Sequence, residues 1–458
     1  MKEIFDYIDQ HKDEFQEELF DLLRIPSISA DSKFKDEVLK AGSFLKEKLE
    51  AIGLDDVLMH ETPGNPIITA SWLHAGDDKP TVLIYGHYDV QPPDPEDLWK
   101  TPPFEPTVRD GKVYARGASD DKGQSYIHVA AVASCLKVSG SLPVNIKFIL
   151  EGEEEIGSPN LVPFLKDNKE LLKCDMVLVS DTSMFGKDTP SITYGLRGLA
   201  YMEVHVTGPN RDLHSGVYGN GVQNPVNALT QILAKMRDED GIVQIPGFYD
   251  NVRELTPDER KAYAELPFDE QEYKDELEIN EVFGEKGYST LERVSGRPSF
   301  DVNGIWGGYQ GEGAKTVLPS MAGAKISMRL VPDQTPEEIY QKVKDYIASI
   351  TPPGVKVEVE EHHGGFPAIV DLNFYGLKAA SKAFETVYGK EALMTREGGS
   401  IPIVADFDKV LGVSTILMGF GLHSDAIHSP NEKFSLEDFH RGMKTSAAFF
   451  HYLDSFKN

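Results

Sequence analysis

Apolar residues recur at helical spacing near the start of the chain. The first amphipathic segment covers residues 1–24 and places these apolar side chains on one face: Ile4, Phe5, Ile8, Phe15, Leu19 and Leu22. A second covers Asp36 to Ile52, with Gly53 following as a glycine C-cap. Both segments predict helices that pack on a core, and neither carries a cluster of reactive side chains.

Four short apolar runs predict buried strands. They cover residues 81–85, 144–150, 176–179 and 415–418. Each run is followed by carboxylate or imidazole side chains: His87 and Asp89 after the first, Glu151, Glu153, Glu154 and Glu155 after the second, Asp181 after the third, and His428 after the fourth. Ligands of open α/β sheets bind outside the carboxyl ends of the strands. Scattered surface acids would not favour one end, so this shared polarity predicts one site.

Two aspartates precede another predicted helix. Asp120 and Asp121 come just before residues 125–137, where a carboxylate suits the N–H groups of the first helical turn. Helix capping is the ordinary interpretation of this pair. Taken alone, His87 and Asp89 likewise fit a loop histidine beside a turn aspartate.

The pattern changes from Gly198 onward to that of a second domain. Residues 200–207 alternate between apolar and polar positions, as in a half-exposed antiparallel strand. Further helices and strands are predicted at 225–237, 324–330, 335–350 and 355–359. The acidic stretch 240–298 has weak periodicity and predicts helices and loops that cover this domain.

The return to the first domain is predicted at Gly364 and Gly365, before two amphipathic helices at 371–386 and 435–456. The expected fold class is therefore α/β, with a sheet flanked by helices and an inserted α+β lid domain. The expected domain ranges are 1–196, 197–363 and 364–458.

Composition excludes several classes of protein. The 458 residues, 40% hydrophobic and 26% charged, fit a soluble protein with at least two cores. The sequence has no run of about 18 apolar residues, so no membrane span is predicted. The first residues lack the apolar core of a signal peptide, and a cytoplasmic location is therefore expected. A net charge of −28 opposes nucleic acid and anionic membranes as partners. The only cysteines, Cys135 and Cys174, predict buried thiols of a reducing compartment.

The acids and imidazoles that follow the strands predict metal chemistry. Divalent ions bind imidazole and carboxylate, and the cysteines are too few for a thiolate site. The candidate ligands are His87, Asp89, Asp120, Glu154 or Glu155, Asp181 and His428. These are too many ligands for one tetrahedral ion, but they suit two ions that share a carboxylate. Two such ions lie roughly 3.5–4 Å apart and can hold a hydroxide between them. A carboxylate left over can then take the proton from that water.

Eight segments in a fixed order carry a family resemblance. They are GHYDVQP (86–92), ARGASDDKG (115–123), LEGEEEIGS (150–158), SD (180–181), DLHSGVYG (212–219), MRLVPDQTPEE (328–338), GGSIP (398–402) and HSPNEK (428–433). Together they resemble the two-metal peptidases that include aminoacylase, succinyl-diaminopimelate desuccinylase, carnosine dipeptidase and cytosolic non-specific dipeptidase. The resemblance runs from about residue 20 to the end and is nearest to the dipeptidase branch.

The resemblance implies a ligand set. One ion would be bound by His87 and Asp181, the other by Glu155 and His428, with Asp120 bridging them. Zinc is the first expectation, with manganese and cobalt also compatible. The peptide bond that follows Asp120 is expected to be cis, as in this family.

The resemblance also implies roles beside the metals. Asp89 would orient His87 by accepting its distal N–H. Glu154 would act as general base and then as acid to the leaving amine. Because three glutamates stand at 153–155, a one-residue slip would exchange base and ligand, and alignment on Gly157-Ser158 favours Glu154 as the base.

In the inserted domain the resemblance implies a homodimer. His214 would reach the active site of the other subunit and steady the oxyanion, and Arg329 would bind the substrate's terminal carboxylate. Thr316 and Ser400 would donate hydrogen bonds to the substrate. Alone, these residues also fit a surface-loop histidine, a structural charge and ordinary loop hydroxyls.

The expected function is two-metal hydrolysis of dipeptides or short peptides with a free terminal carboxylate, by metal-bound hydroxide with a glutamate base. One alternative keeps the metals and removes acetyl or succinyl groups from N-acyl amino acids. A remote alternative is an inactive dimeric binding or scaffold protein.

Overall fold

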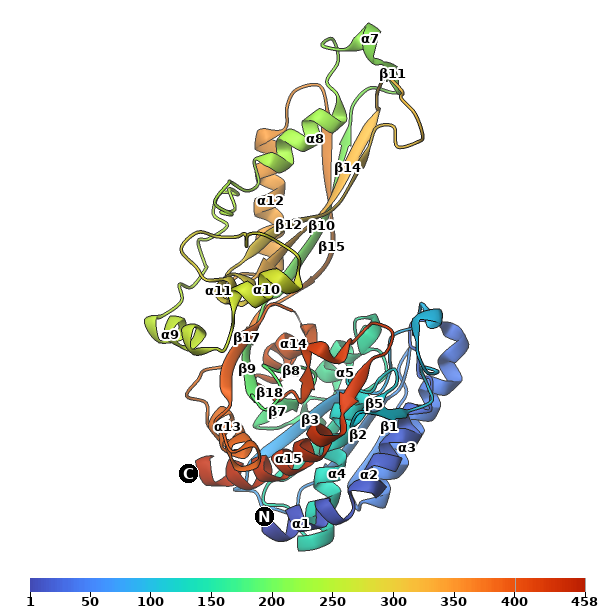
Figure 1. The fold of residues 1–458 in the computed structure, drawn as a ribbon, viewed down its shortest axis with the longest axis vertical. Coiled ribbons are helices and arrows are strands. Elements are labelled where there is room, and N and C mark those ends of the chain that lie inside the picture. The colour runs from blue at the N-terminus through green and yellow to red at the C-terminus, as the bar shows by residue number, and fades with distance from the viewer. Residues whose placement is uncertain (400, 458) are drawn as a thin grey trace. The chain divides into compact units, whose positions relative to one another are not determined.

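The computed structural model describes residues 1–399 and 401–457 and contains two compact units (Figure 1). The α/β unit comprises Met1–Tyr194, Val370–Thr395 and the chain from Asp406 onward. The α+β unit comprises Gly195–Ile369 and the described residues of Arg396–Ala405. The roles that sequence assigns to the domains, catalysis for one and lid and dimerisation for the other, stay a prediction.

A nine-stranded sheet has the order β1-β2-β6-β3-β7-β18-β9-β16, with β17 beside β9, and lies mostly in the α/β unit; β16 and the last residues of β9 and β17 belong to the α+β unit. Its strands are β1 (Asp55–His60), β2 (Ile67–Trp72), β3 (Thr81–His87), β6 (Asn145–Glu151), β7 (Met176–Val179), β9 (Ser191–Leu196), β16 (Ala368–Ile369), β17 (Leu393–Glu397) and β18 (Thr415–Leu417). The four predicted buried strands are β6, β3, β7 and β18, which are consecutive neighbours and parallel to one another. Small sheets join β4 (Thr107–Arg109), β5 (Lys112–Tyr114) and β20 (Lys433–Ser435), and β8 (Ser183–Met184) with β19 (Gly421–Leu422).

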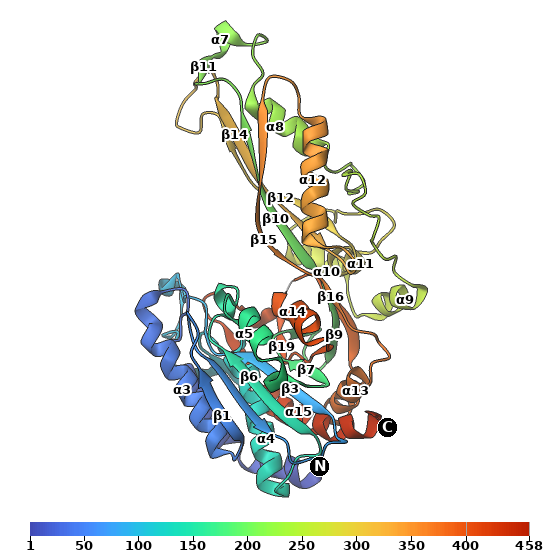
Figure 2. The ribbon, with the colours of Figure 1, turned by 180° about the vertical axis from the view of Figure 1, so that it is seen from behind.

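Helices cover both faces of this sheet, which confirms the α/β fold class. On one face, α1, α2, α4 and α15 pack together (Figures 1 and 2). A Cβ on Gly86 of β3 would lie 1.9 Å from Ser125 Oγ of α4, so glycine permits this close approach. The neighbouring Tyr85 points to the opposite face, where its ring lies 5.4 Å from that of Phe407 on α14.

The predicted helices at the two ends of the chain are confirmed, with the first one interrupted at His11. The helices that are mostly or wholly in this unit are α1 (Lys2–Gln10), α2 (Lys12–Leu23), α3 (Lys35–Ala51), α4 (Lys122–Ser139), α5 (Leu161–Asp167), α6 (Lys169–Leu172), α13 (Tyr375–Tyr388), α14 (Pro402–Leu411) and α15 (Leu436–Lys457). Short 3₁₀ turns lie at η1 (Ser32–Phe34), η2 (Glu96–Leu98), η3 (Glu154–Ile156) and η4 (His423–Asp425).

The α+β unit is built on a four-stranded antiparallel sheet in the order β12-β14-β10-β15. Its elements are β10 (Gly198–Thr207), β11 (Leu213–His214), α7 (Ser215–Tyr218), α8 (Pro225–Ala234), α9 (Pro257–Glu265), α10 (Glu270–Glu276), α11 (Thr290–Ser295), β12 (Ser299–Gly307), β13 (Val317–Leu318), β14 (Met321–Leu330), α12 (Pro336–Ile350) and β15 (Lys356–Gly365). The predicted alternation in β10 is confirmed: Ala200, Met202 and Val204 are buried in a core shared with α8 and α12. Among the described residues, no helix is both long and apolar enough to span a membrane.

Candidate metal centre and active site

The acidic and imidazole side chains predicted to share a site do converge. Because β6, β3, β7 and β18 are parallel, their carboxyl ends lie at one edge of the sheet. His87 ends β3 directly opposite Glu151 of β6. Val179, the last residue of β7, pairs with Leu417 of β18. The chain that follows each strand therefore reaches the same place.

Two groups of ligand atoms share Asp120. His87, Asp120 and Asp181 form one group, and Asp120, Glu155 and His428 form the other, with the atoms of each group within 4.8 Å of one another. Asp120 Oδ1 lies 3.1 Å from His87 Nε2, whereas Oδ2 lies 2.9 Å from His428 Nε2. Each oxygen of one carboxylate thus faces a different imidazole.

The donor set fits divalent cations. His87 is 1% exposed, and its buried Nε2 atom faces Asp120 Oδ1 at 3.1 Å but does not make a hydrogen bond of good geometry. A buried polar nitrogen left in this way costs free energy unless it has a partner. Imidazole nitrogens and carboxylate oxygens are ligands of zinc and related ions, so the two groups suit two ions that share Asp120.

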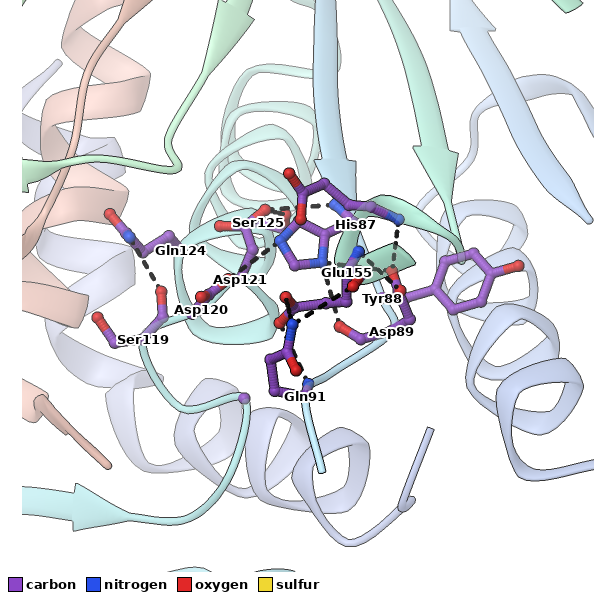
Figure 3. Close-up of polar contacts among 12 residues, drawn as sticks. His87, Tyr88, Asp89, Gln91, Ser119, Asp120, Asp121, Gln124, Ser125 and Glu155 are labelled. Atoms are coloured by element: carbon purple, nitrogen blue, oxygen red, sulfur yellow. Dashed lines mark hydrogen bonds and ion pairs between the residues drawn. The ribbon is translucent and has the colours of Figure 1, made fainter. Parts of the chain in front are cut away.

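The ring of His87 is held from its other side (Figure 3). Its Nδ1 atom lies 3.1 Å from the carbonyl oxygen of Asp89 and 3.4 Å from Asp89 Oδ1. The carboxylate oxygens of Asp89 also accept the backbone N–H groups of Glu154 and Glu155, at 3.2 and 3.1 Å. Buried Asp89 therefore connects the β3 histidine to the turn that carries the two glutamates.

The three consecutive glutamates point to different partners. Glu153 turns away from the ligand groups and accepts hydrogen bonds from the Asn65 backbone N–H and the Asn160 amide, at 3.0 and 2.7 Å. Glu155 Oε2 lies 3.3 Å from His428 Nε2. Glu154 lies on the same turn, and burial, together with nearby carboxylates, raises its pKa to about 7.

Gln91 orients Glu155 and was given no role from sequence. Its backbone N–H and side-chain Nε2 donate to the two oxygens of Glu155, at 3.1 and 2.7 Å. Gln91 lies inside the GHYDVQP segment, so its position in a family motif was the available signal.

The capping interpretation of the aspartate pair is wrong. Asp121 occupies the N-cap position of α4, but in the described structure its carboxylate makes no capping bond to the first turn. It instead accepts Ser125 Oγ–H and the backbone N–H of His87. Asp120 faces the two imidazoles, and the bond between the aspartates is cis, as the resemblance implied.

The buried carboxylates of the site repel one another and are stabilised by nearby positive charge. Burial and the neighbouring acids raise the pKa of Asp181 well above its usual range. Burial would also raise the pKa of Asp120, but the imidazoles of His428 and His87 beside its carboxylate lower it. The contacts with Asp120 and Glu155 raise the pKa of His428 to about 10. Divalent cations would offset this repulsion among the acids.

His214 and Thr316 lie together in the α+β unit. His214 pairs with Val317, and the Thr316 carbonyl accepts the Ser215 N–H at 3.0 Å. His214 and Thr316 are exposed. His214 Nδ1 accepts the Gly216 N–H at 3.0 Å, which leaves Nε2 to carry the ring proton.

Arg329 lies near the carboxyl end of β14 in the four-stranded sheet, whereas His214 belongs to the separate two-stranded sheet of β11 and β13. Arg329 is half-buried on β14, opposite Leu199 of β10 and Ser299 of β12, and burial lowers its pKa. His214 lies beyond the far end of β14, where Asp212 Oδ1 accepts the Ser320 N–H. Ser400, the remaining predicted substrate contact, lies outside the described residues.

Comparisons with known proteins agree on one family. The sequence model of peptidase family M20/M25/M40 matches residues 83–452. The chain is 34% identical to the Cys-Gly metallodipeptidase dug1 of Schizosaccharomyces pombe, over 99% of this chain and 98% of that protein. It is 33% identical to the human Beta-Ala-His dipeptidase, over 98% and 92%. The crystal structure of human carnosine dipeptidase 1 matches with a TM-score of 0.81 and 32% identity, over 99% and 98% of the two chains.

Proposed function

Because the chain belongs to peptidase family M20/M25/M40 and is a metallodipeptidase, we propose that its two ligand groups hold two divalent ions that act on one peptide bond. His87 and Asp181 would hold one ion, Glu155 and His428 the other, and Asp120 both. We propose zinc as the ion, with manganese or cobalt compatible with the same ligands.

One observation carries this assignment. The two oxygens of Asp120 point to different imidazoles, at 3.1 and 2.9 Å, and Asp120 is the one residue that belongs to both groups. A buried carboxylate placed in this way suits a bridge between two cations. Two ions in such a site lower the pKa of a water molecule between them and polarise the substrate carbonyl.

Glu154 is the proposed proton carrier. Its neighbours are occupied, since Glu153 is bound by asparagines and Glu155 belongs to a ligand group. The pKa of Glu154 is raised to about 7, chiefly by burial, and this is near the value at which a general base can also return the proton as an acid. The carboxyl group would accept a proton from the attacking water and donate it to the leaving amine.

We propose that Arg329 and His214 bind the two negatively charged groups of the reacting substrate, its terminal carboxylate and the developing oxyanion. The guanidinium of Arg329 would bind the free terminal carboxylate. The Nε2–H of His214 would donate to the oxyanion that develops on the scissile carbonyl. Thr316, which lies beside His214, and Ser400 would add hydroxyl donors.

The geometry of the sheet supports a homodimer in which these groups come from different subunits. Met321, near the His214 end, and Arg329 are eight residue steps apart along β14, which is roughly 26 Å at about 3.3 Å per step. An extended dipeptide spans only about 7 Å. His214 and Arg329 of one chain therefore cannot both contact one dipeptide, so a second subunit would supply His214 and Thr316.

We also propose a cytoplasmic location, supported by the two cysteines, Cys135 and Cys174, which are both free. Cys135 is buried as predicted, whereas Cys174 is only partly buried, and free thiols are typical of a reducing compartment.

The test is metal-restored hydrolysis. Chelator-stripped protein would receive zinc, manganese or cobalt in turn, and amino-acid release would be measured on Cys-Gly, β-Ala-His and other dipeptides. N-acetyl and N-succinyl amino acids and dipeptide C-terminal amides complete the panel. Cleavage of free dipeptides with about two ions bound per chain is the expected result. Full activity with one ion, or equal cleavage of the amides, would contradict the site proposed here.

A further inference from the structure

A second buried carboxylate holds the loop that ends at Asp120. Glu432 is fully buried, and its two oxygens accept four hydrogen bonds. Oε1 accepts the backbone N–H groups of Ser119 and Asp120, at 2.9 and 3.1 Å. Oε2 accepts the Gly117 N–H at 3.0 Å and Arg116 Nη1 at 2.7 Å. All four donors belong to residues 116–120.

The position of Glu432 is itself fixed by secondary structure. The residue directly precedes β20, which pairs with β5. Its carbonyl oxygen accepts the N–H of Ala115, at 3.2 Å, just after β5. Glu432 also follows His428 by four residues. One carboxylate thus joins the loop that carries one imidazole to the loop that carries the shared aspartate.

We propose that Glu432 is a positioning residue for metal binding: by accepting the backbone N–H groups of Gly117, Ser119 and Asp120, it fixes Asp120 where the two ligand groups meet. This proposal rests on the proposed two-metal function. The contact at Asp120 is to the backbone of the ligand residue itself, so any retreat of the Glu432 carboxylate frees the Asp120 backbone. Groups that orient a metal ligand in this way commonly change metal affinity about 10–100-fold when they are mutated.

A different role for Glu432 would be to neutralise Arg116, which is 1% exposed. The Arg116 guanidinium also donates to the Pro92 carbonyl at 3.1 Å and lies 5.6 Å from the ring of Trp99. If charge neutralisation were the whole role, a substitution in either partner that keeps its charge would leave metal affinity unchanged. The positioning role predicts that the two partners differ, because three of the four bonds to Glu432 come from the backbone.

Three variants separate these roles. Glu432→Gln keeps the size of the side chain but replaces one acceptor oxygen by an NH₂ group. Whichever way the amide is turned, part of the 116–120 loop then faces a donor instead of an acceptor. Glu432→Asp keeps the charge beside Arg116 but withdraws the carboxylate by one methylene. Arg116→Lys keeps the positive charge and leaves the three backbone bonds to Glu432. Glu285→Gln is the matched control, since Glu285 binds Arg297, which is also buried, in the α+β unit, at 2.7 Å.

The measurement is the dissociation constant of each ion, obtained on chelator-stripped protein by competition with a chromophoric chelator. Urea unfolding of the metal-free variants provides the comparison for stability. We expect Glu432→Gln to weaken the binding of both ions by about 10–100-fold, and Glu432→Asp to weaken it by at least several-fold. Arg116→Lys and Glu285→Gln should stay within about threefold of wild type in metal affinity even where they lose stability. Because Glu432→Asp keeps the ion pair, it carries the test if Glu432→Gln does not fold.

Two results would overturn the proposal. The first is wild-type metal affinity in a folded Glu432 variant, and the second is an equal loss of affinity in Arg116→Lys. Either result leaves the two-metal function standing if the wild-type chain binds two ions. A wild-type chain that binds no ion, or one, would instead defeat the proposed function on which the inference rests.

Discussion

Acid should destabilise this protein through one buried histidine. His128 lies on α4, is fully buried, and connects three elements. Its Nδ1 lies 2.9 Å from Ser446 Oγ of α15, and its Nε2 lies 2.8 Å from Ser180 Oγ, beyond β7. Ser180 donates its own proton to the Met418 carbonyl at 2.6 Å, so it accepts from His128. Nε2 therefore carries a proton, and because burial lowers the pKa of the ring to about 3, Nδ1 carries none at pH 7 and the imidazole is neutral.

The magnitude follows from linkage between protonation and folding. Burial lowers the pKa of His128 to about 3, whereas an unfolded histidine titrates near 6.5. Because the folded pKa is the lower one, the stabilisation is fully present above about pH 6.5 and is lost as the pH falls toward 3. For this one group the free energy of unfolding should fall by about 2 kcal/mol between pH 7 and pH 5, and by about 3 kcal/mol by pH 4.

The assay is urea unfolding of the metal-free protein at pH 7 and pH 5, read from the transition of the α/β unit. In His128→Gln the side chain no longer titrates, so the acid-induced loss should be smaller than in wild type by about 2 kcal/mol. The control is His451→Gln, which replaces an exposed histidine of α15. Equal losses in wild type and His128→Gln would refute the reasoning, because all other titrating groups are common to both proteins.

Four further predictions concern the site. Glu154→Gln should keep both metals, measured by elemental analysis, yet lower dipeptide turnover by a factor of about 10²–10⁴, the usual share of a general base; unimpaired turnover would assign the proton transfer elsewhere. His428→Ala should lower bound metal from about two ions to about one per chain, because one group keeps only Asp120 and Glu155; unchanged content would remove the histidine from the ligands. Arg329→Met should raise KM for dipeptides by about 10–100-fold, as expected for the loss of a charged hydrogen bond worth about 1.5–3 kcal/mol. The variant should also lose the preference for a free terminal carboxylate over the terminal amide. If that preference persists, another group binds the carboxylate. Mixing inactive His214→Ala with inactive Glu154→Gln should restore part of the activity, since one hybrid site has both groups; no recovery after verified subunit exchange would mean that the histidine acts within its own chain.

The part of the fold that sequence predicted is the part with strong local patterns. The runs 81–85, 144–150, 176–179 and 415–418 are almost wholly apolar because both faces of β3, β6, β7 and β18 are covered, so their boundaries are sharp. The polar residues just beyond them identified the site because parallel strands bring those ends together. Local sequence therefore contained both the strands and their direction.

The strands that were not predicted lack such a pattern. Most residues of β12 are at least partly exposed, with Phe300 as its one buried side chain, so no alternation is visible. β1 is an edge strand without buried residues. Glu432 was missed for a different reason: its four hydrogen-bond donors lie more than 300 residues away in sequence. Only the folded chain shows that this glutamate and Arg116 form a pair.

The same distinction explains how three consecutive glutamates can differ in their proposed roles as support, base and metal ligand. Glu153, Glu154 and Glu155 differ only in which neighbours their turn presents, and the turn is set by the carboxylate of Asp89. Asp89 is in turn fully buried beside the Nδ1 atom of His87. Because each carboxylate bound by N–H donors is a poor candidate for moving protons, the hydrogen bonds to Glu153 leave Glu154 as the acid whose pKa burial can raise. The proposed role of each glutamate therefore depends on the backbone and amide N–H groups around it. The number and spacing of acidic residues in the sequence do not reveal those donors.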